Sequence, residues 1–206
     1  KTISKNFIFD DEFGKERSFG FYSTLFLTEK SIGLDFYGLN FQSEQRKYNH
    51  NSGPENRQTV GFRLFSDLKK FNFEIEGTYQ TGQFNSLSID AYNVFADVNI
   101  TILQKMKARI GLAANISSGD KNSSDNKLNT YNLLYAKPAY GLAIPLGSAN
   151  MISIYPYIKI NPVPKLNILT QVFFLQINSD QDGLYSPSMI MVRPQPETSS
   201  NSNSMY

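Results

Sequence analysis

The chain has 206 residues, 20 basic and 18 acidic side chains and a formal net charge of +2. No run of Lys and Arg exceeds two residues, so neither the charge nor its distribution favours a nucleic-acid-binding protein. The absence of cysteine excludes disulfides, thiol catalysis and cysteine-ligated zinc, and the single histidine, His50, disfavours histidine-based metal or triad chemistry.

Alternation of apolar and polar residues with a period of two recurs along the chain, whereas helical periodicity is scarce. From Phe71 to Gln80, for example, aromatic and aliphatic side chains face one way and Asn, Glu and Thr face the other. The pattern predicts strands at 18–28, 31–42, 57–66, 71–81, 88–101, 106–117, 150–160, 165–178 and, more weakly, 188–193.

Apolar runs do not exceed four residues, which is far short of the roughly 18 that a membrane-spanning helix needs. Several predicted strands, at about 10 to 14 residues, instead have the length that crosses a bilayer in a β-barrel. The start, Lys1–Lys5, lacks a signal-peptide hydrophobic region, so we expect either a mature chain or a fragment.

Connections between the predicted strands alternate between short and long, as in outer-membrane barrels with tight periplasmic turns and longer extracellular loops. The short ones are Glu29–Lys30, Asp67–Lys70, Leu103–Lys105 and Asn161–Pro164, and the longer ones are Ser43–Asn56, Gly82–Leu87, Ser118–Ala149 and Ser179–Pro187. We therefore predict an all-β, antiparallel transmembrane β-barrel with at least eight strands present. The alternative of another class is a soluble β-sandwich that binds carbohydrate.

Six ordered motifs are specific enough to compare with a known family: Arg57–Arg63, Phe73–Gly82, Ile89–Tyr92, Ala108–Leu112, Ser118–Asp120 and Asn129–Tyr135. Their order and spacing resemble the alginate-export family of outer-membrane proteins, with a looser likeness over residues 15–193. Tyr131 stands where that family usually has Phe. The resemblance implies part of a larger barrel, since family members have more strands than the eight or nine predicted here.

Three segments follow from this interpretation. Residues 1–17 form an N-terminal segment that is either strand or loop, 18–193 form the barrel strands and loops, and 194–206 form a polar tail or loop that we expect to be flexible. The resemblance also implies the function: passive transport or export of an anionic, alginate-like polysaccharide or a similar acidic solute. A general or differently selective porin is the alternative.

Charged residues opposite the apolar faces are predicted to line the lumen and the substrate path: Arg63, Glu74, Glu76, Lys107, Arg109 and Lys159. Arginine can pair with a carboxylate through two parallel hydrogen bonds, which suits a passing polyuronate. The alternative is that the cations pair with Glu74, Glu76 or Asp97 across strands and hold the wall rigid. Small residues after Arg109 on its face, Gly111 and Ala113, predict room for a chain beside it.

No catalytic residues, cofactor or metal site are expected. Glu74 and Glu76 could be mistaken for a glycosidase pair, but a solvated lumen face explains them better. Ser118–Asp125 offers oxygen donors for calcium, yet its spacing departs from an EF-hand, which favours a surface loop. Expected partners are membrane lipid or lipopolysaccharide, an anionic polysaccharide or small anionic solute, and periplasmic export components; no nucleic acid is expected.

Aromatic residues near the strand ends are candidates for interfacial girdles or for core packing. They are Tyr22, Phe36, Tyr37, Phe71, Tyr79, Tyr92, Phe95, Tyr155, Tyr157, Phe173 and Phe174.

Overall fold

The computed structural model describes residues 16–28, 31–122, 124–134 and 144–194, and over these ranges it is built of strands and turns. In the same ranges we find no helix with the length and apolar character to span a membrane. The strands are β1 (Glu16–Thr28), β2 (Ile32–Tyr48), β3 (Asn51–Ser66), β4 (Phe71–Phe84), β5 (Leu87–Leu103), β6 (Ala108–Ser117), β7 (Lys127–Leu128), β8 (Met151–Val163), β9 (Leu166–Gln171), β10 (Phe174–Ile177), β11 (Leu184–Tyr185) and β12 (Met191–Arg193).

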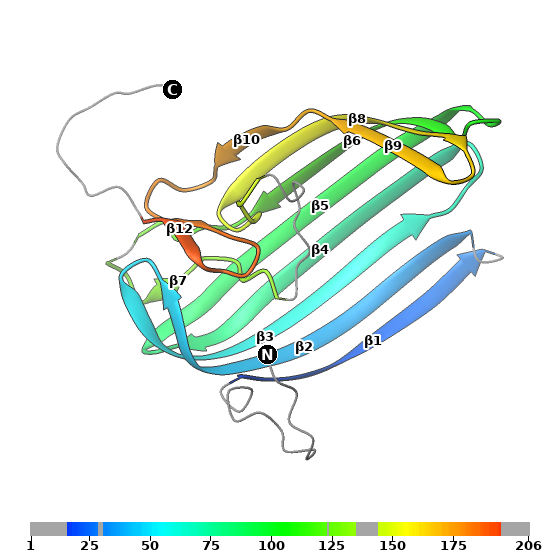
Figure 1. The fold of residues 1–206 in the computed structure, drawn as a ribbon. Helices are drawn as coiled ribbons and strands as arrows, with labels where there is room; N and C mark the ends of the chain where they lie inside the picture. Colours follow the sequence, from blue (N-terminus) through cyan, green and yellow to red (C-terminus); the bar gives the residue numbers. More distant parts are fainter. Residues whose placement is uncertain (1–15, 29–30, 123, 135–143, 195–206) are drawn as a thin grey trace, which may run out of the picture.

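The main sheet has ten strands and curves into a trough (Figure 1). Its path runs β1-β2-β3-β4-β5-β6-β8-β10 with antiparallel neighbours, and β9 pairs with the other half of β8. The predicted strand 165–178 is therefore two strands, interrupted at Val172–Phe173. The predicted all-β antiparallel fold is confirmed, and within the described residues the sheet does not close on itself.

The convex face of the sheet is apolar, as the alternation predicted. On β5 the outward residues run from Tyr92 to Ile102, and Val98 and Ile100 on that face are 43% and 48% exposed. Ten residue steps cover about 34 Å along the strand, which a tilt of about 40° reduces to about 26 Å. That height matches the apolar band of about 25 Å on outer-membrane barrels. Within the described residues no second sheet covers this face, so the sandwich alternative fails.

The apolar band ends where Tyr79 and Tyr92 lie opposite each other on β4 and β5. The next outward residues along those two strands are Thr81 and Asp90, and beyond them Gln83 and Ser88. Strands therefore continue past the apolar band with polar side chains on their outer face.

This continuation corrects the predicted loop lengths. The connection predicted at Ser43–Asn56 is a two-residue turn, because β2 reaches Tyr48 and β3 starts at Asn51; the turn residue Asn49 has a φ of 48°. Polar residues on both faces suggested a loop, but where both faces meet water such residues are compatible with a hydrogen-bonded ladder. The connection predicted at Gly82–Leu87 is likewise shortened by the extents of β4 and β5.

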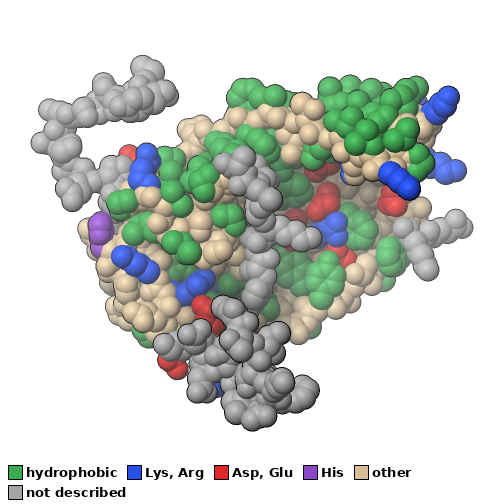
Figure 2. Space-filling model, viewed as in Figure 1, with side chains coloured by type: hydrophobic (Ala, Val, Ile, Leu, Met, Phe, Trp, Pro, Cys, Tyr) green, Lys and Arg blue, Asp and Glu red, His purple; other side chains and the backbone are tan. Residues whose placement is uncertain are grey.

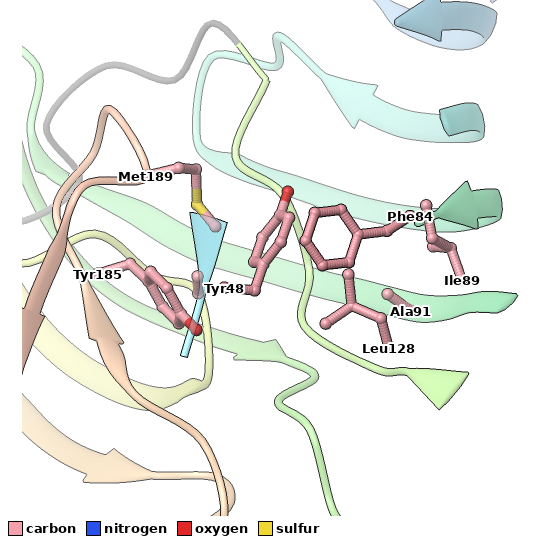
Figure 3. Packing of buried hydrophobic residues seen from close by; sticks show 8 residues of the cluster. Tyr48, Phe84, Ile89, Ala91, Leu128, Tyr185 and Met189 are labelled. Carbon is pink, nitrogen blue, oxygen red and sulfur yellow. The ribbon is translucent and has the colours of Figure 1, made fainter. Parts of the chain in front are cut away.

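The described parts of the long connection between β6 and β8, together with β11 and β12, fold back into the trough at the end opposite the β3–β4 and β5–β6 turns (Figure 1). There β7 pairs in parallel with β5, with Ile89 opposite Leu128. A buried apolar cluster forms around them (Figure 3) and consists of Tyr48, Phe84, Ile89, Ala91, Leu128, Ala149, Tyr185 and Met189. Because Phe84 and Ala91 are fully buried on the concave face, the loops cover the inner wall rather than project away from it.

Residues 1–15 and 195–206, which hold most of the predicted N-terminal segment and tail, lie outside the described residues. The boundary near residue 17 falls inside β1, which begins at Glu16. The weak strand predicted at 188–193 corresponds to β12, which pairs with β11 in a separate two-stranded sheet.

Candidate functional site: the charged concave wall

The charged side chains predicted to line the lumen lie on the concave face in two groups. We call Asp35, Arg63, Glu74, Glu76 and Asp97, on β2 to β5, the acidic wall. We call Lys107, Arg109 and Lys159, on the β5–β6 turn, β6 and β8, the basic corner. Figure 2 shows side chains of both signs inside the hollow of the trough.

Arg63 is an internal partner of the acidic wall. Its Nε and Nη2 donate to the two carboxylate oxygens of Glu74 at 2.8 and 3.0 Å, and its Nη1 donates to Asp35 at 3.1 Å. The Arg63 and Glu74 side chains are each about one-third exposed, at 30% and 33%. This bidentate contact fixes the guanidinium. Arg63 therefore fits the alternative interpretation, in which a cation pairs with carboxylates across strands and holds the wall rigid.

The remaining carboxylates of the acidic wall are held by neutral donors. The Tyr37 hydroxyl donates to Glu76, and the Tyr157 hydroxyl and Asn99 Nδ2 donate to Asp97 at 3.0 and 2.9 Å. With four carboxylates and one guanidinium, the acidic wall has a formal charge of −3 when all five groups are ionised.

The basic corner has the opposite character. Arg109 lies opposite Lys159 in the antiparallel pairing of β6 with β8, so both side chains leave the same face. Together with Lys107, Asn161 and Asn167 they line a cavity of about 240 Å³. Among the described residues, none of the three cations forms an ion pair, and none of the residues lining this cavity is acidic.

A second cavity of about 310 Å³ adjoins the first, because Lys107 and Arg109 line both. It is also lined by Thr101, whose Oγ1 is buried and has no hydrogen-bond partner in the described part of the chain. Asp67 and Lys69 complete its charged lining. Lys107 and Arg109 therefore offer donors to an anion in both cavities, with Asp67 as the one carboxylate among the lining residues of the second.

Two tyrosine rings lie flat on the concave wall over glycines. A Cβ at Gly111 would lie 2.2 Å from Cζ of Tyr157, and a Cβ at Gly61 would lie 2.3 Å from Cζ of Tyr37. The space that the sequence predicted beside Arg109 is therefore not empty, because the Tyr157 ring occupies the position over Gly111.

The aromatic candidates divide between the two faces. Phe36, Phe71, Tyr79, Tyr92 and Phe174 are among the exposed aromatics, and strand alternation places them on the convex side with the apolar band. Tyr22 and Tyr37 stack on the concave side, with ring centroids 5.8 Å apart. Tyr155 and Tyr157 share the face of Lys159 on β8, so these four tyrosines do not form an outer girdle.

A buried hydrogen-bond network centred on Arg57, here called the Arg57 hub, holds the start of the loop between β7 and β8 against the concave face. It was not predicted from the sequence alone. Arg57 is fully buried, pairs with Glu55 and donates to Gln80 Oε1 at 2.8 Å and to the Thr130 carbonyl at 3.2 Å. Gln80 in turn exchanges two hydrogen bonds with the backbone of Asn132, at 2.9 and 3.0 Å. The sequence did contain one indication, because alternation along β3 puts Arg57 on the same face as Arg63.

The loop after β6 is not wholly a surface loop. Ser118 and Asp120 are 1% and 5% exposed, and the Asp120 backbone N–H donates to Asp182 at 2.8 Å. Burial, followed by the charge of Asp182, raises the pKa of Asp120 to about 6. In the described residues no three His, Cys, Asp or Glu side chains are placed to share a metal ion.

Comparison with known proteins agrees with this architecture. The family model described as Alginate export matches residues 4–203, nearly the whole chain. Searches of curated proteins and of solved structures gave no significant match. The family match, together with the antiparallel sheet, its apolar convex band and its charged concave wall, shows that the chain belongs to the alginate export family of outer-membrane β-barrel proteins.

Proposed function

We propose that this protein forms the wall of a bacterial outer-membrane channel that passes an anionic polysaccharide passively, and that the polymer moves along the basic corner. The observation that carries the proposal is a set of three cations, Lys107, Arg109 and Lys159, that form no ion pair with the described residues and line a cavity whose described lining has no carboxylate. The family supports the class of solute, because alginate is a polymer of sugar carboxylates.

The strength of the contact suits passage rather than capture. A unit charge pair at about 4 Å is worth about 1 kcal/mol in water, and the corner is a wet surface. Three such cations attract a polyanion while leaving each carboxylate free to exchange, which conduction through a selective pore requires. Arg63, Glu74 and Glu76 would act differently in this proposal. They lie on β3 and β4, separated from β6 by β5 on the same concave face, and their net negative charge would keep the polymer on the β6–β8 side.

The surroundings of the channel follow from the same orientation. Lipid or lipopolysaccharide would cover the apolar convex band. The basic corner lies at the end opposite the long connection between β6 and β8. In outer-membrane barrels the end opposite the long loops is the periplasmic end. Periplasmic export components would therefore deliver the polymer close to Lys107 and its neighbours.

A general porin remains the second candidate, and one observation favours it. The four cations of the concave wall are balanced by four carboxylates, Asp35, Glu74, Glu76 and Asp97, so its two groups together carry no net formal charge. A channel with such a wall can admit small ions of both signs along opposite sides.

Ion selectivity in planar bilayers tests the proposal. The double variant Arg109→Gln, Lys159→Gln should lower the anion-to-cation permeability ratio obtained from reversal potentials in a salt gradient. The control Arg63→Gln, Glu74→Gln removes one cation and one carboxylate of a bonded pair and should leave the ratio close to wild type. An unchanged ratio in the first variant would remove the basic corner from the ion path.

A further inference from the structure

The Tyr157 ring lies across Gly111 on the concave wall of the trough, and the residue is partly exposed. Tyr157 on β8 lies opposite Gly111 on β6, which lies opposite Asn99 on β5. The ring crosses Gly111, where a Cβ would meet Cζ at 2.2 Å and Cε1 and the hydroxyl oxygen at 2.5 Å. Its hydroxyl reaches Asp97 on β5 at 3.0 Å. One face of the ring therefore lies against the β6 backbone and the other is turned inward.

This aromatic face borders the basic corner. Lys159 follows Tyr157 on the same face of β8, about 7 Å further along the strand, and Arg109 lies opposite Lys159. On the other side of Tyr157 the next residue of that face is Tyr155, whose ring packs against Phe173 with centroids 5.0 Å apart. Aromatic surface thus continues from the two cations toward the end of the trough that holds the loops.

We propose that Tyr157 and the basic corner together form a binding site for a uronic acid ring, a six-membered sugar that carries a carboxylate. The carboxylate would lie between Arg109 and Lys159, and the C–H face of the sugar would pack on the inward face of Tyr157. The face of an aromatic ring is electronegative, and the C–H bonds of a pyranose present weak positive charge to it.

This inference rests on the proposed function and adds a specificity that charge alone does not provide. Cations attract any polycarboxylate, whereas a flat ring beside them favours a polymer whose carboxylates are attached to sugar rings. The site would therefore distinguish an acidic polysaccharide from an acidic polypeptide of the same charge.

Tyr37 provides a matched control elsewhere on the same wall. Its ring also lies over a glycine, Gly61, and its hydroxyl also donates to a carboxylate, Glu76. Its surroundings differ, because the Tyr22 ring stacks beside it and the nearest ionised groups belong to the acidic wall. The cation of that wall, Arg63, is already held by Glu74 and Asp35, so a sugar acid finds no unpaired cation among the described residues there.

The test measures block of single-channel current in the full-length protein by two polymers of equal charge, a uronic acid oligomer and polyglutamate. Tyr157→Leu should raise the half-blocking concentration of the uronic acid oligomer about tenfold and leave that of polyglutamate within about twofold of wild type. Tyr157→Phe, which keeps the ring and loses the hydroxyl, should restore most of the block. Tyr37→Leu should match wild type with both polymers. Heat modifiability on gels confirms that each variant is assembled.

Each contrary result has a distinct meaning. Equal weakening of both polymers by Tyr157→Leu, or equal loss in Tyr157→Leu and Tyr157→Phe, would overturn the stacking site. A wild-type channel blocked by polyglutamate but not by the uronic acid oligomer would also overturn it, while leaving the anion path of the proposed function in place. A channel that neither polymer blocks would refute both.

Discussion

Replacing Arg57 with methionine should release the loop that follows β7, around Thr130, from the concave wall. The guanidinium is fully buried and joins Glu55 on its own strand to Gln80 on β4 and to the Thr130 carbonyl in the loop. Removing one partner of a buried ion pair costs about 3–5 kcal/mol, because the other charge stays buried without compensation. Glu55 would keep the Tyr48 hydroxyl at 2.9 Å, so the lower end of that range applies.

A loss of about 3 kcal/mol corresponds to a roughly 150-fold larger opening constant for the loop. The strand ladders do not depend on Arg57, so the barrel should remain assembled while the loop opens. Hydrogen exchange of the peptide 127–134 measures this opening directly. Arg57→Lys keeps the positive charge, but one ammonium group cannot bond to all the partners of the guanidinium. It should therefore raise the opening constant less, by about tenfold. If Arg57→Met leaves exchange in this peptide within about twofold of wild type, the hub does not hold the loop.

Three further changes test other parts of the structure. Cysteine at His50 should react with an impermeant thiol reagent on intact cells and cysteine at Lys69 should not; the reverse pattern would invert the orientation. The raised pKa of Asp120 means that its protonated form is favoured by folding, so local stability of the loop should be greatest below about pH 4 and fall as the pH rises to about 6. Hydrogen exchange corrected for intrinsic rates should show this slope, and Asp120→Asn should reduce it to the part that comes from Asp182, whose pKa burial also raises. Val98→Arg, on the convex face, should lower the free energy of unfolding by about 2–4 kcal/mol in urea titrations in lipid, whereas Asn99→Arg on the concave face should cost much less.

The strands and their two faces were predictable because a period of two survives wherever one side of a sheet meets lipid and the other meets water. That signal disappears above the apolar band, where residues such as Asn56 and Gln83 put polar side chains on the outer face as well. Composition alone then resembles a loop, although the backbone ladder of β2 and β3 continues to Tyr48 and Asn51. The loop lengths at that end were overestimated for this reason.

Alternation also predicted that each cation lies on the concave side, but it did not predict which carboxylate the cation bonds to. Arg63 lies opposite Glu76 in the register of β3 with β4, yet its guanidinium bonds to Glu74, one step of the same face away. The reach of the side chain decides which of the two carboxylates is bonded, and the spacing of residues in the sequence does not give this information. In the same way, Gly111 predicts open space until the register brings Tyr157 across it. Arg57 shares the parity of Arg63, but its burial depends on a loop more than 70 residues further along the chain, as its bond to Thr130 shows.

Efflux of labelled oligosaccharides from proteoliposomes tests the central claim most directly. The protein should release a uronic acid oligomer faster than a neutral oligosaccharide of the same length. The triple variant Lys107→Gln, Arg109→Gln, Lys159→Gln should bring the two rates together while leaving the neutral rate unchanged. Equal rates for both oligomers in the wild type, or a preference for the acidic oligomer that survives the loss of all three cations, would contradict a polysaccharide path along the basic corner.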